Sequence, residues 1–573
     1  MFAVAILILA IALGLKLSPK DHQHDQKQSH IQTAGQIGLA GAVALFGVDY
    51  FSSFFYATGE MMHVLHPLGM QGYAWVPVVV VSIVNIIFGG LYIYSLGPFN
   101  EGGGSYTASM RYLAPVLSLV VAVTLLEDYV MTVVVSALSG ADQFLSIMGK
   151  FDSAWYWHFS IGAVLAAATW FITIRGRGES ARTVFLLLAV FVILTVIMAG
   201  GLIYAATTHS VKPAPIETEH TTSLAHALFA LLGASMKGLV ALTGLEAMSN
   251  GIQFVKNEDA GVVRWGKRRF PQYQRLWAFY SGKVGIGRFV QTSFLFYGGI
   301  TTTFAAIFAI RFNVFDGTDG RTLIGNLAYI GYSVFPSGSI LFGAYQILSV
   351  LLLAAASMTA FQDTQATAWR DVAIGEIPQF VCHRDKKGTF TRSVTATFAI
   401  SVLIMFLVGG RTTHAIPFYG VGVFLPIMIM GLAIRKHILA AEKGRLRRVG
   451  AVLAGTAAVI SGFVFLSQLF ARWEEGGWIR LVTFTVLFGS AHLILMSNVG
   501  KRSPEQIKYI VRERARVQGA MASIVEWQSL KMQEYRYHLL VGLNRRLGKL
   551  GISFQPGPAP LAAGPYNPDH HLD

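Results

Sequence analysis

The sequence predicts an all-α polytopic membrane protein, and three observations support this fold class. Of the 573 residues, 53% are hydrophobic and only 13% are charged, about half the charged fraction of a typical soluble protein. Apolar runs close to the ~20 residues that cross a bilayer recur along the whole chain. Basic and neutral connections alternate between these runs, as expected for loops on opposite sides of a membrane.

Twelve apolar segments are long enough to serve as membrane-spanning helices, and they make up a membrane domain over residues 36–500. Several exceed the minimum length, so we expect tilted or interrupted helices. The predicted spans are 36–65, 72–97, 113–144, 156–175, 183–206, 228–253, 289–312, 330–362, 394–410, 414–434, 449–471 and 478–499.

Lys and Arg gather in every second connection. The basic connections are 175–182, 254–288, 382–392 and 435–448, and those nearly free of Lys and Arg are 66–71, 207–222 and 313–322. Because cytoplasmic loops carry the excess of Lys and Arg, the first span should begin in the cytoplasm and the C-terminal tail should lie there. The net charge of +15 therefore needs no nucleic-acid partner.

The two ends of the chain differ from the membrane domain. Residues 1–17 form an apolar helix, which is either an extra span or a helix lying on the bundle, and a polar linker follows to residue 35. Residues 501–573 predict one or two amphipathic helices and a disordered Pro/Gly-rich end. We expect these helices to pack on the membrane surface or to contact another subunit. Their apolar positions are Ile507, Ile510, Val511, Val517, Met521 and Ile524.

Polar side chains occur deep inside four predicted spans, where ionisable groups are costly and usually functional. The first span contains "GVDYFSSFFYATGE" (47–60), and the others contain "LLEDYVMTVVVS" (125–136), "ALTGLEAMSN" (241–250) and "HAIPFYGVGVFLP" (414–426). At 100° per residue, the side chains within each span share or adjoin one helix face. The candidate residues are Asp49, Tyr56, Asp128, Thr132, Ser136, Thr243, Glu246 and Tyr419.

These groups supply carboxylate, hydroxyl and phenol oxygens, with no buried Lys or Arg expected to pair with them. Such an array suits a hard monovalent cation or a proton, since oxygen ligands can replace the hydration shell of an ion. Clustered acids cannot all stay ionised cheaply, so we expect one of them to carry a proton. The interruptions in spans one and six, five spans apart, indicate an inverted five-plus-five repeat with a site near mid-membrane.

Five sequence blocks, taken together and in this order, resemble the amino acid–polyamine–organocation (APC) superfamily, and most closely the KUP/KimA-type potassium importers. The blocks are "GVDYFSSFFYATGE", "NEGGGSYTASM", "LLEDYVMTVVVSALSGADQF", "ALTGLEAMSNGI" and "GGRTTHAIPFYGVGVFLP". The resemblance covers residues 36–500 and implies a LeuT-like fold with 12 core helices in the plasma membrane, which is the inner membrane of a bacterial cell. It also implies secondary potassium uptake with protons by alternating access.

The resemblance also implies roles for the eight candidate residues as ligands of K⁺ and H⁺. The family's Asp and Tyr on helix 1 match Asp49 and Tyr56. Its polar residues on helices 3, 6 and 10 match Asp128, Thr132, Ser136, Thr243, Glu246 and Tyr419.

Three features depart from the family. About 73 residues follow position 500, too few for the cytosolic domain that such importers carry, so their dimer mode and nucleotide regulation are not carried over, while a homodimer stays open. The basic connection 254–288 and Asp363, near the cytoplasmic end of the eighth span, are also unusual.

Other functions stay open on the sequence alone. The main rival is a proton-coupled amino acid or polyamine permease of the same fold, although bulk and negative charge in span one disfavour a substrate carboxylate. A receptor without transport is a third class. No nucleophile–base arrangement predicts an enzyme, no cofactor is expected, and the lone Cys382 excludes an internal disulfide. The segment "NEGGGSYTASM" lacks the lysine of a phosphate loop and is expected to be a flexible connection.

Overall fold

The computed structural model describes most of the predicted membrane domain and part of the tail. The described residues are 37–175, 181–208, 223–374, 376–377, 381, 390–471, 473, 477–497, 522–550, 553–557, 559–560 and 564. Within them the structure is helical throughout, with one isolated bridge between Ile37 and Val255. The apolar segment 1–17, Cys382, the tail positions up to Met521 and the last nine residues lie outside the described part.

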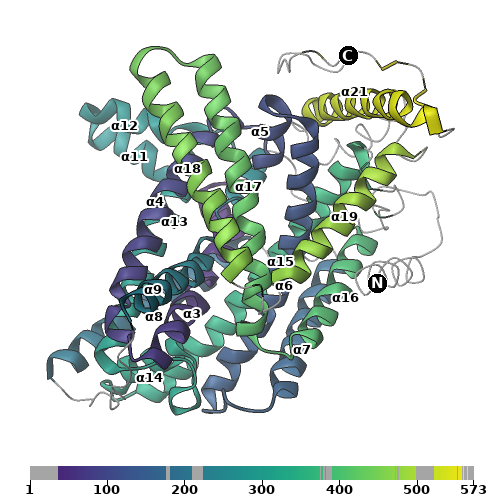
Figure 1. Cartoon of the computed structure of the whole chain (residues 1–573). Coiled ribbons are helices and arrows are strands. Elements are labelled where there is room, and N and C mark those ends of the chain that lie inside the picture. Colours follow the sequence, from purple (N-terminus) through teal and green to yellow (C-terminus); the bar gives the residue numbers. More distant parts are fainter. Residues whose placement is uncertain are drawn as a thin grey trace.

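Each of the twelve predicted spans overlaps a long helix or a helix pair (Figure 1). Eleven of these spans are long and apolar enough to cross a membrane. The remaining one, α16, is a shorter apolar helix of 17 described residues. The chain is therefore a multi-pass membrane protein. The spans are α2 (Leu39–Ser52) with α3 (Phe54–Leu65), α4 (Trp75–Ser95), α6 (Pro115–Ile147), α7 (Trp155–Ile174), α8 (Ala181–Thr208), α9 (Leu224–Gly238) with α10 (Ala247–Gly251), α13 (Gly282–Phe312), α15 (Gly338–Ile374), α16 (Thr391–Leu407), α17 (Thr412–Ala441), α18 (Gly444–Ala471) and α19 (Trp478–Met496).

Two local predictions are wrong. The predicted span 330–362 joins two helices, because α14 (Leu323–Ser333) ends before Pro336 and α15 begins at Gly338 and continues to Ile374. A side chain at position 338 would collide with the Tyr332 carbonyl, which accounts for glycine at this tight turn. The segment "NEGGGSYTASM" is not a flexible connection, since its second half forms the buried helix α5 (Gly104–Tyr112).

The helix contacts follow a two-fold pattern that relates the first five spans to the next five. The pairs α4 and α13, α6 and α15, and α7 and α16 pack together. The short helix α5 precedes α6 and packs on α17, and its counterpart α14 precedes α15 and packs on α8. Because each half holds an odd number of spans, corresponding helices run in opposite directions. The inverted five-plus-five repeat is thus confirmed, with α18 and α19 outside it.

The two interruptions differ in how far the helix is disrupted. In the first span the helix is only kinked at Ser53, whose backbone stays right-handed. In the sixth span it is fully unwound after the turn η3 (Leu239–Leu242): Thr243 is extended and Gly244 has φ +84° before α10 begins. The sixth span therefore supplies the open backbone near the middle of the bundle.

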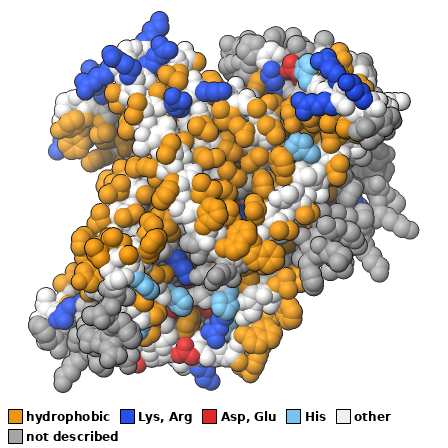
Figure 2. Space-filling model, in the orientation of Figure 1, with side chains coloured by type: hydrophobic (Ala, Val, Ile, Leu, Met, Phe, Trp, Pro, Cys, Tyr) orange, Lys and Arg blue, Asp and Glu red, His pale blue; other side chains and the backbone are white. Residues whose placement is uncertain are grey.

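Apolar side chains cover the middle of the molecule, and Lys and Arg gather most densely at one end (Figure 2). This basic end carries α11 (Gly261–Arg269), α12 (Gln274–Phe279) and the turn between α17 and α18 (Figure 1). Two basic connections that the sequence assigns to the same side thus lie together, as the alternation of loops requires.

The tail helix α21 (Ala522–Leu547) also lies at the basic end, where it packs on α15, α19 and α6. Gln528 donates a hydrogen bond to Thr107 of α5, at 3.2 Å, and Arg536 donates one to the Leu495 carbonyl, at 2.8 Å. Within the tail, the structure describes a helix over 522–547. It docks on its own chain, an arrangement that the sequence did not indicate.

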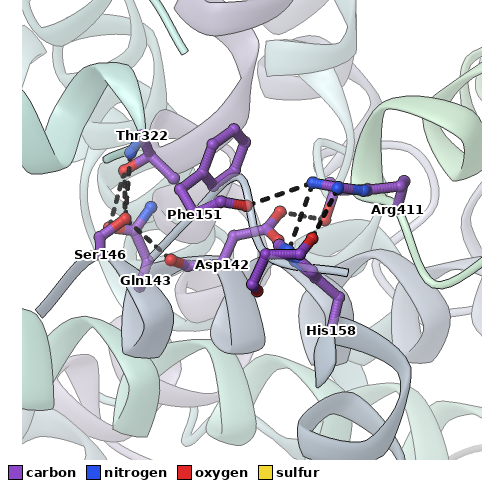
Figure 3. A network of polar contacts seen from close by, with 9 residues as sticks. Asp142, Gln143, Ser146, Phe151, His158, Thr322 and Arg411 are labelled. Carbon is purple, nitrogen blue, oxygen red and sulfur yellow. Dashed lines mark hydrogen bonds and ion pairs between the residues drawn. The ribbon is translucent and has the colours of Figure 1, made fainter. Parts of the chain in front are cut away.

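A polar network ties three helices together at the opposite end of the bundle (Figure 3). Asp142 of α6 lies 2.6 Å from His158 Nδ1 and accepts a hydrogen bond of 2.6 Å from Thr412 at the start of α17. Arg411 Nη1 lies 3.3 Å from His158 Nε2. Because a guanidinium only donates, Nε2 accepts and the Nδ1–H donates to Asp142. One carboxylate thus joins α6, α7 and α17.

We expect Asp142→Ala to destabilise the protein by about 3 kcal/mol, because buried donors on His158 and Thr412 lose their acceptor. The thermal unfolding temperature of the detergent-purified protein, measured by tryptophan fluorescence, should fall by several degrees. Asp152→Ala removes an exposed carboxylate and serves as the matched control. Equal unfolding temperatures for the two variants would show that the network does not hold these helices.

Candidate functional site

An internal cavity lies in the middle of the bundle, beside the unwound part of the sixth span. Four of the eight predicted site residues line it, one or more from each of α2, α6 and the sixth span: Asp49, Asp128, Thr132 and Glu246. The remaining four are buried around it. The structure therefore brings together acids that are up to 197 positions apart in the chain, as the sequence predicted.

Gly244 allows the sixth span to approach α2 closely. Its φ of +84° is a backbone conformation that glycine adopts without strain. A Cβ at this position would lie 2.9 Å from the Tyr50 amide nitrogen and 3.0 Å from Asp49 Oδ2. The unwound segment is thus pressed directly against the Asp49 carboxylate.

Hydroxyl groups join the two interrupted spans next to this contact. Ser53 Oγ lies 2.8 Å from Thr243 Oγ1 and 2.9 Å from the Tyr56 hydroxyl. The Tyr56 hydroxyl is 3.5 Å from Thr243. Ser53 was not among the predicted residues, although it lies about one helical turn from both Asp49 and Tyr56, and its position at the kink explains its role.

A second hydroxyl pair joins α6 to α17. Thr132 Oγ1 lies 3.0 Å from the Tyr419 hydroxyl, and both residues are buried. Ser136, one turn further along α6, is buried but does not line the cavity. The predicted oxygen stripe on α6 therefore reaches the cavity through Asp128 and Thr132 only.

Glu246 is held firmly by donors from two helices. Its carboxylate accepts hydrogen bonds from the Ser105 amide at 2.8 Å, from the Ser105 hydroxyl, and from the Tyr92 hydroxyl at 3.2 Å. Ser105 lies in the first turn of α5, where free amide groups and the helix dipole favour an anion. The segment expected to be a flexible connection thus fixes one of the site's acids.

The expectation that no buried Lys or Arg pairs with these acids is wrong. Arg480 of α19 is 5% exposed, and its guanidinium lies 3.6 Å from Glu127 Oε2 and 4.0 Å from Asp128 Oδ1. An arginine in the first turn of a span normally extends toward the headgroups, and only the packing of α19 on α6 turns this one inward. The signal in the sequence was a charge inside the predicted span 478–499.

Asp363 is a fourth acid of the cavity, and it was not among the eight site residues predicted from the sequence. It lines the cavity from α15 with Thr359, one helical turn earlier. The spacing of four between Thr359 and Asp363 puts both on one face of α15, a pattern like that of Asp128 and Thr132. Tyr92, Tyr129 and Asn250 also contribute to the lining.

The cavity suits a small cation better than an anion. Four carboxylates line it, and Asp49 Oδ1 and Asp128 Oδ1 are buried without a hydrogen-bond donor among the described residues. Buried carboxylate oxygens without partners are costly unless a cation, water or proton satisfies them. In the described part of the chain, no three His, Cys, Asp or Glu side chains converge to chelate a metal ion. The acids surround the space instead of forming a chelate.

The fold and the cavity define a multi-pass membrane protein with the inverted repeat typical of secondary transporters. An amino acid permease family model matches residues 2–266. The chain is 25% identical to potassium transporter KimA of Bacillus subtilis (strain 168) over 531 residues, which cover 91% of this chain and 81% of KimA. These comparisons confirm the resemblance to KimA-type proteins of the APC superfamily. A solved mutant manganese transporter from Eremococcus coleocola covers 86% of this chain, and all of its own, at 10% identity and TM-score 0.41, too low a score to support a conclusion.

We expect Gly244→Ala to destabilise the protein by about 1–2 kcal/mol, because a Cβ is strained at positive φ and would collide with Asp49 and Tyr50. Thermal unfolding of the purified protein measures the effect. Gly233→Ala is the matched control, since a Cβ in that helix meets nothing closer than 3.9 Å. Unchanged unfolding of Gly244→Ala would mean that the sixth span is not held against α2 as described.

Proposed function

We propose that this protein takes up potassium across the plasma membrane by K⁺/H⁺ symport with alternating access. The observation that carries the proposal is the pair of buried, donor-free oxygens on Asp49 and Asp128, which face one cavity beside the unwound sixth span. A dehydrated monovalent cation needs such oxygens. The similarity to a protein named potassium transporter KimA supports potassium as the cargo.

The eight predicted residues divide into two groups in this proposal. Asp49 and Asp128 hold the cation, because one oxygen of each has no hydrogen-bond donor in the described part of the chain, whereas Glu246 is already bound by Ser105 and Tyr92 and sets the charge of the site. The neutral oxygens shape the cation's surroundings and its path: Tyr56, Thr132, Ser136, Thr243 and Tyr419.

The charge balance of the cavity supports coupling to protons. Asp49, Asp128, Glu246 and Asp363 contribute up to four negative charges, and the Arg480 guanidinium beside Asp128 is shared with a fifth acid, Glu127. One bound potassium ion cannot balance these carboxylates, and uncompensated carboxylates are costly inside a membrane. Proton binding by a carboxylate removes this cost. Each inward positive charge gains roughly 2.3 kcal/mol per 100 mV of membrane potential.

An amino acid or polyamine permease of the same fold is the second candidate, supported by the amino acid permease family model. The cavity disfavours an amino acid, because four carboxylates would repel a substrate carboxylate and the first span is kinked without freeing backbone amides. A cationic polyamine is compatible with the charge, and uptake assays separate it from potassium.

For the orientation, we infer that the basic end faces the cytoplasm, because Lys- and Arg-rich loops are retained there. The tail helix α21 would then be cytoplasmic. In a bacterium the protein would lie in the inner membrane.

The test is growth of a potassium-uptake-deficient bacterium at low potassium. The protein should restore growth, and Asp128→Asn should lower rubidium uptake at least about tenfold, the effect of losing one strong cation contact, while still reaching the membrane. Asp152→Asn, at an exposed carboxylate, should keep wild-type uptake.

Proteoliposomes test the coupling. An inward proton gradient should accelerate rubidium uptake at zero membrane potential, and equal uptake with and without the gradient would refute symport. Uptake of labelled amino acids or polyamines without growth rescue, by a well-expressed protein, would overturn the potassium proposal.

A further inference from the structure

Arg480 reaches the site from a helix outside the repeat. It lies in the first turn of α19, which packs on α6, lines no part of the cavity and places one further side chain, Thr483, beside Glu127. Its guanidinium lies between Glu127 and Asp128 on one side and donates to the carbonyls of Phe418 and Tyr419 on the other, the latter at 3.3 Å.

The neighbouring backbone is shaped to accept this side chain. A Cβ at Gly422 would overlap the guanidinium of Arg480, so α17 has room for the arginine only because residue 422 is glycine. One of the bonded carbonyls belongs to Tyr419, whose hydroxyl contacts Thr132. The other belongs to its neighbour Phe418. The fixed positive charge is thus part of the wall that contains two predicted site residues.

The two acids beside Arg480 are not equivalent. Asp128 lines the cavity, whereas Glu127 does not, and Glu127 is the closer partner at 3.6 Å against 4.0 Å. A cation in the cavity can therefore take the Asp128 carboxylate while the guanidinium remains paired with Glu127. When the cavity is empty, Asp128 remains paired with Arg480.

We propose that Arg480 is a tethered cation that shares Asp128 with the transported ion, and this inference rests on the proposed function. Without cargo, the guanidinium compensates Asp128, which spares the empty transporter an isolated charge at depth. With cargo bound, the guanidinium weakens the hold of Asp128 on the ion and so promotes its release. Arg480 is then a positioning residue that sets affinity and turnover together.

The test compares rubidium uptake kinetics of the wild type with Arg480→Gln and Arg480→Lys in proteoliposomes. Removal of the charge should lower KM about tenfold and lower the maximal rate at least as much, because the ion leaves an unshared carboxylate more slowly. Arg480→Lys keeps the charge and should retain a KM within about threefold of wild type. Arg435→Gln, at an exposed arginine on α17, controls for the loss of one positive charge.

A purely structural role would reduce the maximal rate of Arg480→Gln without lowering KM, and this result would overturn the inference. If Arg480→Gln is not monodisperse after purification, Glu127→Gln combined with Arg480→Gln removes both partners and should still lower KM. Absent uptake by the wild type would refute the proposed function, whereas active wild-type uptake with unchanged KM in the variants would refute only the tether.

A separate observation concerns the connection between the sixth span and α13. It forms an arm of α11, the turn η5 (Pro271–Tyr273) and α12, which projects from the basic end beside α4 and α13 (Figure 1). Trp277 packs on Gly266 and donates a 2.8 Å hydrogen bond to the Phe270 carbonyl, so the helices of the arm are fixed to each other.

The exposed surface of the arm combines aromatic and basic side chains, with Lys and Arg in Figure 2 gathered above apolar groups. Lys267 pairs with Asp259 at 2.6 Å, and this contact together with the Gly282 amide lowers the pKa of Asp259. No carboxylate among the described residues lies within 4 Å of Arg264, Arg268 or Arg269. The exposed apolar residues are Val262, Trp265, Phe270, Tyr273, Leu276 and Phe279.

We propose that this arm binds anionic phospholipid headgroups at the membrane surface. Aromatic rings favour the headgroup layer, and each nearby Lys or Arg adds attraction to anionic lipid. The arm begins and ends at membrane spans, which holds it at the depth of this layer. Charge complementarity and position therefore select a lipid surface as its partner.

The test uses the full chain in nanodiscs of phosphatidylglycerol or of phosphatidylcholine, with brominated lipid as a quencher. Trp265 fluorescence, taken as the difference from Trp265→Phe, should be quenched at least twofold more in phosphatidylglycerol. Replacing Arg264, Arg268 and Arg269 by Gln should abolish that difference. The matched control replaces Arg445, Arg447 and Arg448, exposed at the start of α18, and should preserve it. Equal quenching in both lipids, or equal loss in both triple variants, would overturn the proposal.

Discussion

Keeping carboxylates in the interior of a membrane protein is the constraint on which the rest of this structure depends. An ionised acid loses its hydration there, and only a donor, a positive charge or a proton can compensate the loss. Each acid of the cavity meets this constraint differently. Glu246 is bound by Ser105 and Tyr92, Asp128 lies beside Arg480, and Asp49 keeps an oxygen without a donor in the described part of the chain.

The backbone follows from the same constraint. A continuous sixth helix would use its amides internally and would keep its axis a full helix diameter from α2. Unwinding at Thr243 and Gly244 brings the chain so close to α2 that a Cβ on Gly244 would lie 3.0 Å from Asp49 Oδ2. The matching kink at Ser53 brings a hydroxyl to Thr243. The inverted repeat places these two interruptions side by side, and neither alone would create the cavity.

Much of this arrangement could be predicted from the sequence, because periodicity and depth report on single helices. The twelve spans and the acids Asp49, Asp128 and Glu246 follow from apolar length and from charges far from helix ends. Packing between helices that are distant in the chain cannot be predicted from such single-helix patterns. Arg480 could not be assigned to Asp128, since its direction depends on how α19 sits on α6. Helix α5 was missed because the three glycines at its start indicate a loop, whereas Ser105 and Thr107 gain partners only in the folded bundle.

Two of the helices whose role the sequence did not reveal, α5 and α19, lie outside the paired core spans, and yet both contact acids of the site. Helix α5 holds Glu246, and α19 directs Arg480 to Asp128. The tail helix α21 contacts both, through Gln528 on Thr107 and Arg536 on the Leu495 carbonyl. The paired core spans supply the oxygens and the break, while the periphery supplies the donors and the positive charge that make these oxygens tolerable. The repeat alone therefore does not determine the electrostatics of the site, and proteins that share this core can differ in charge balance according to the helices around it.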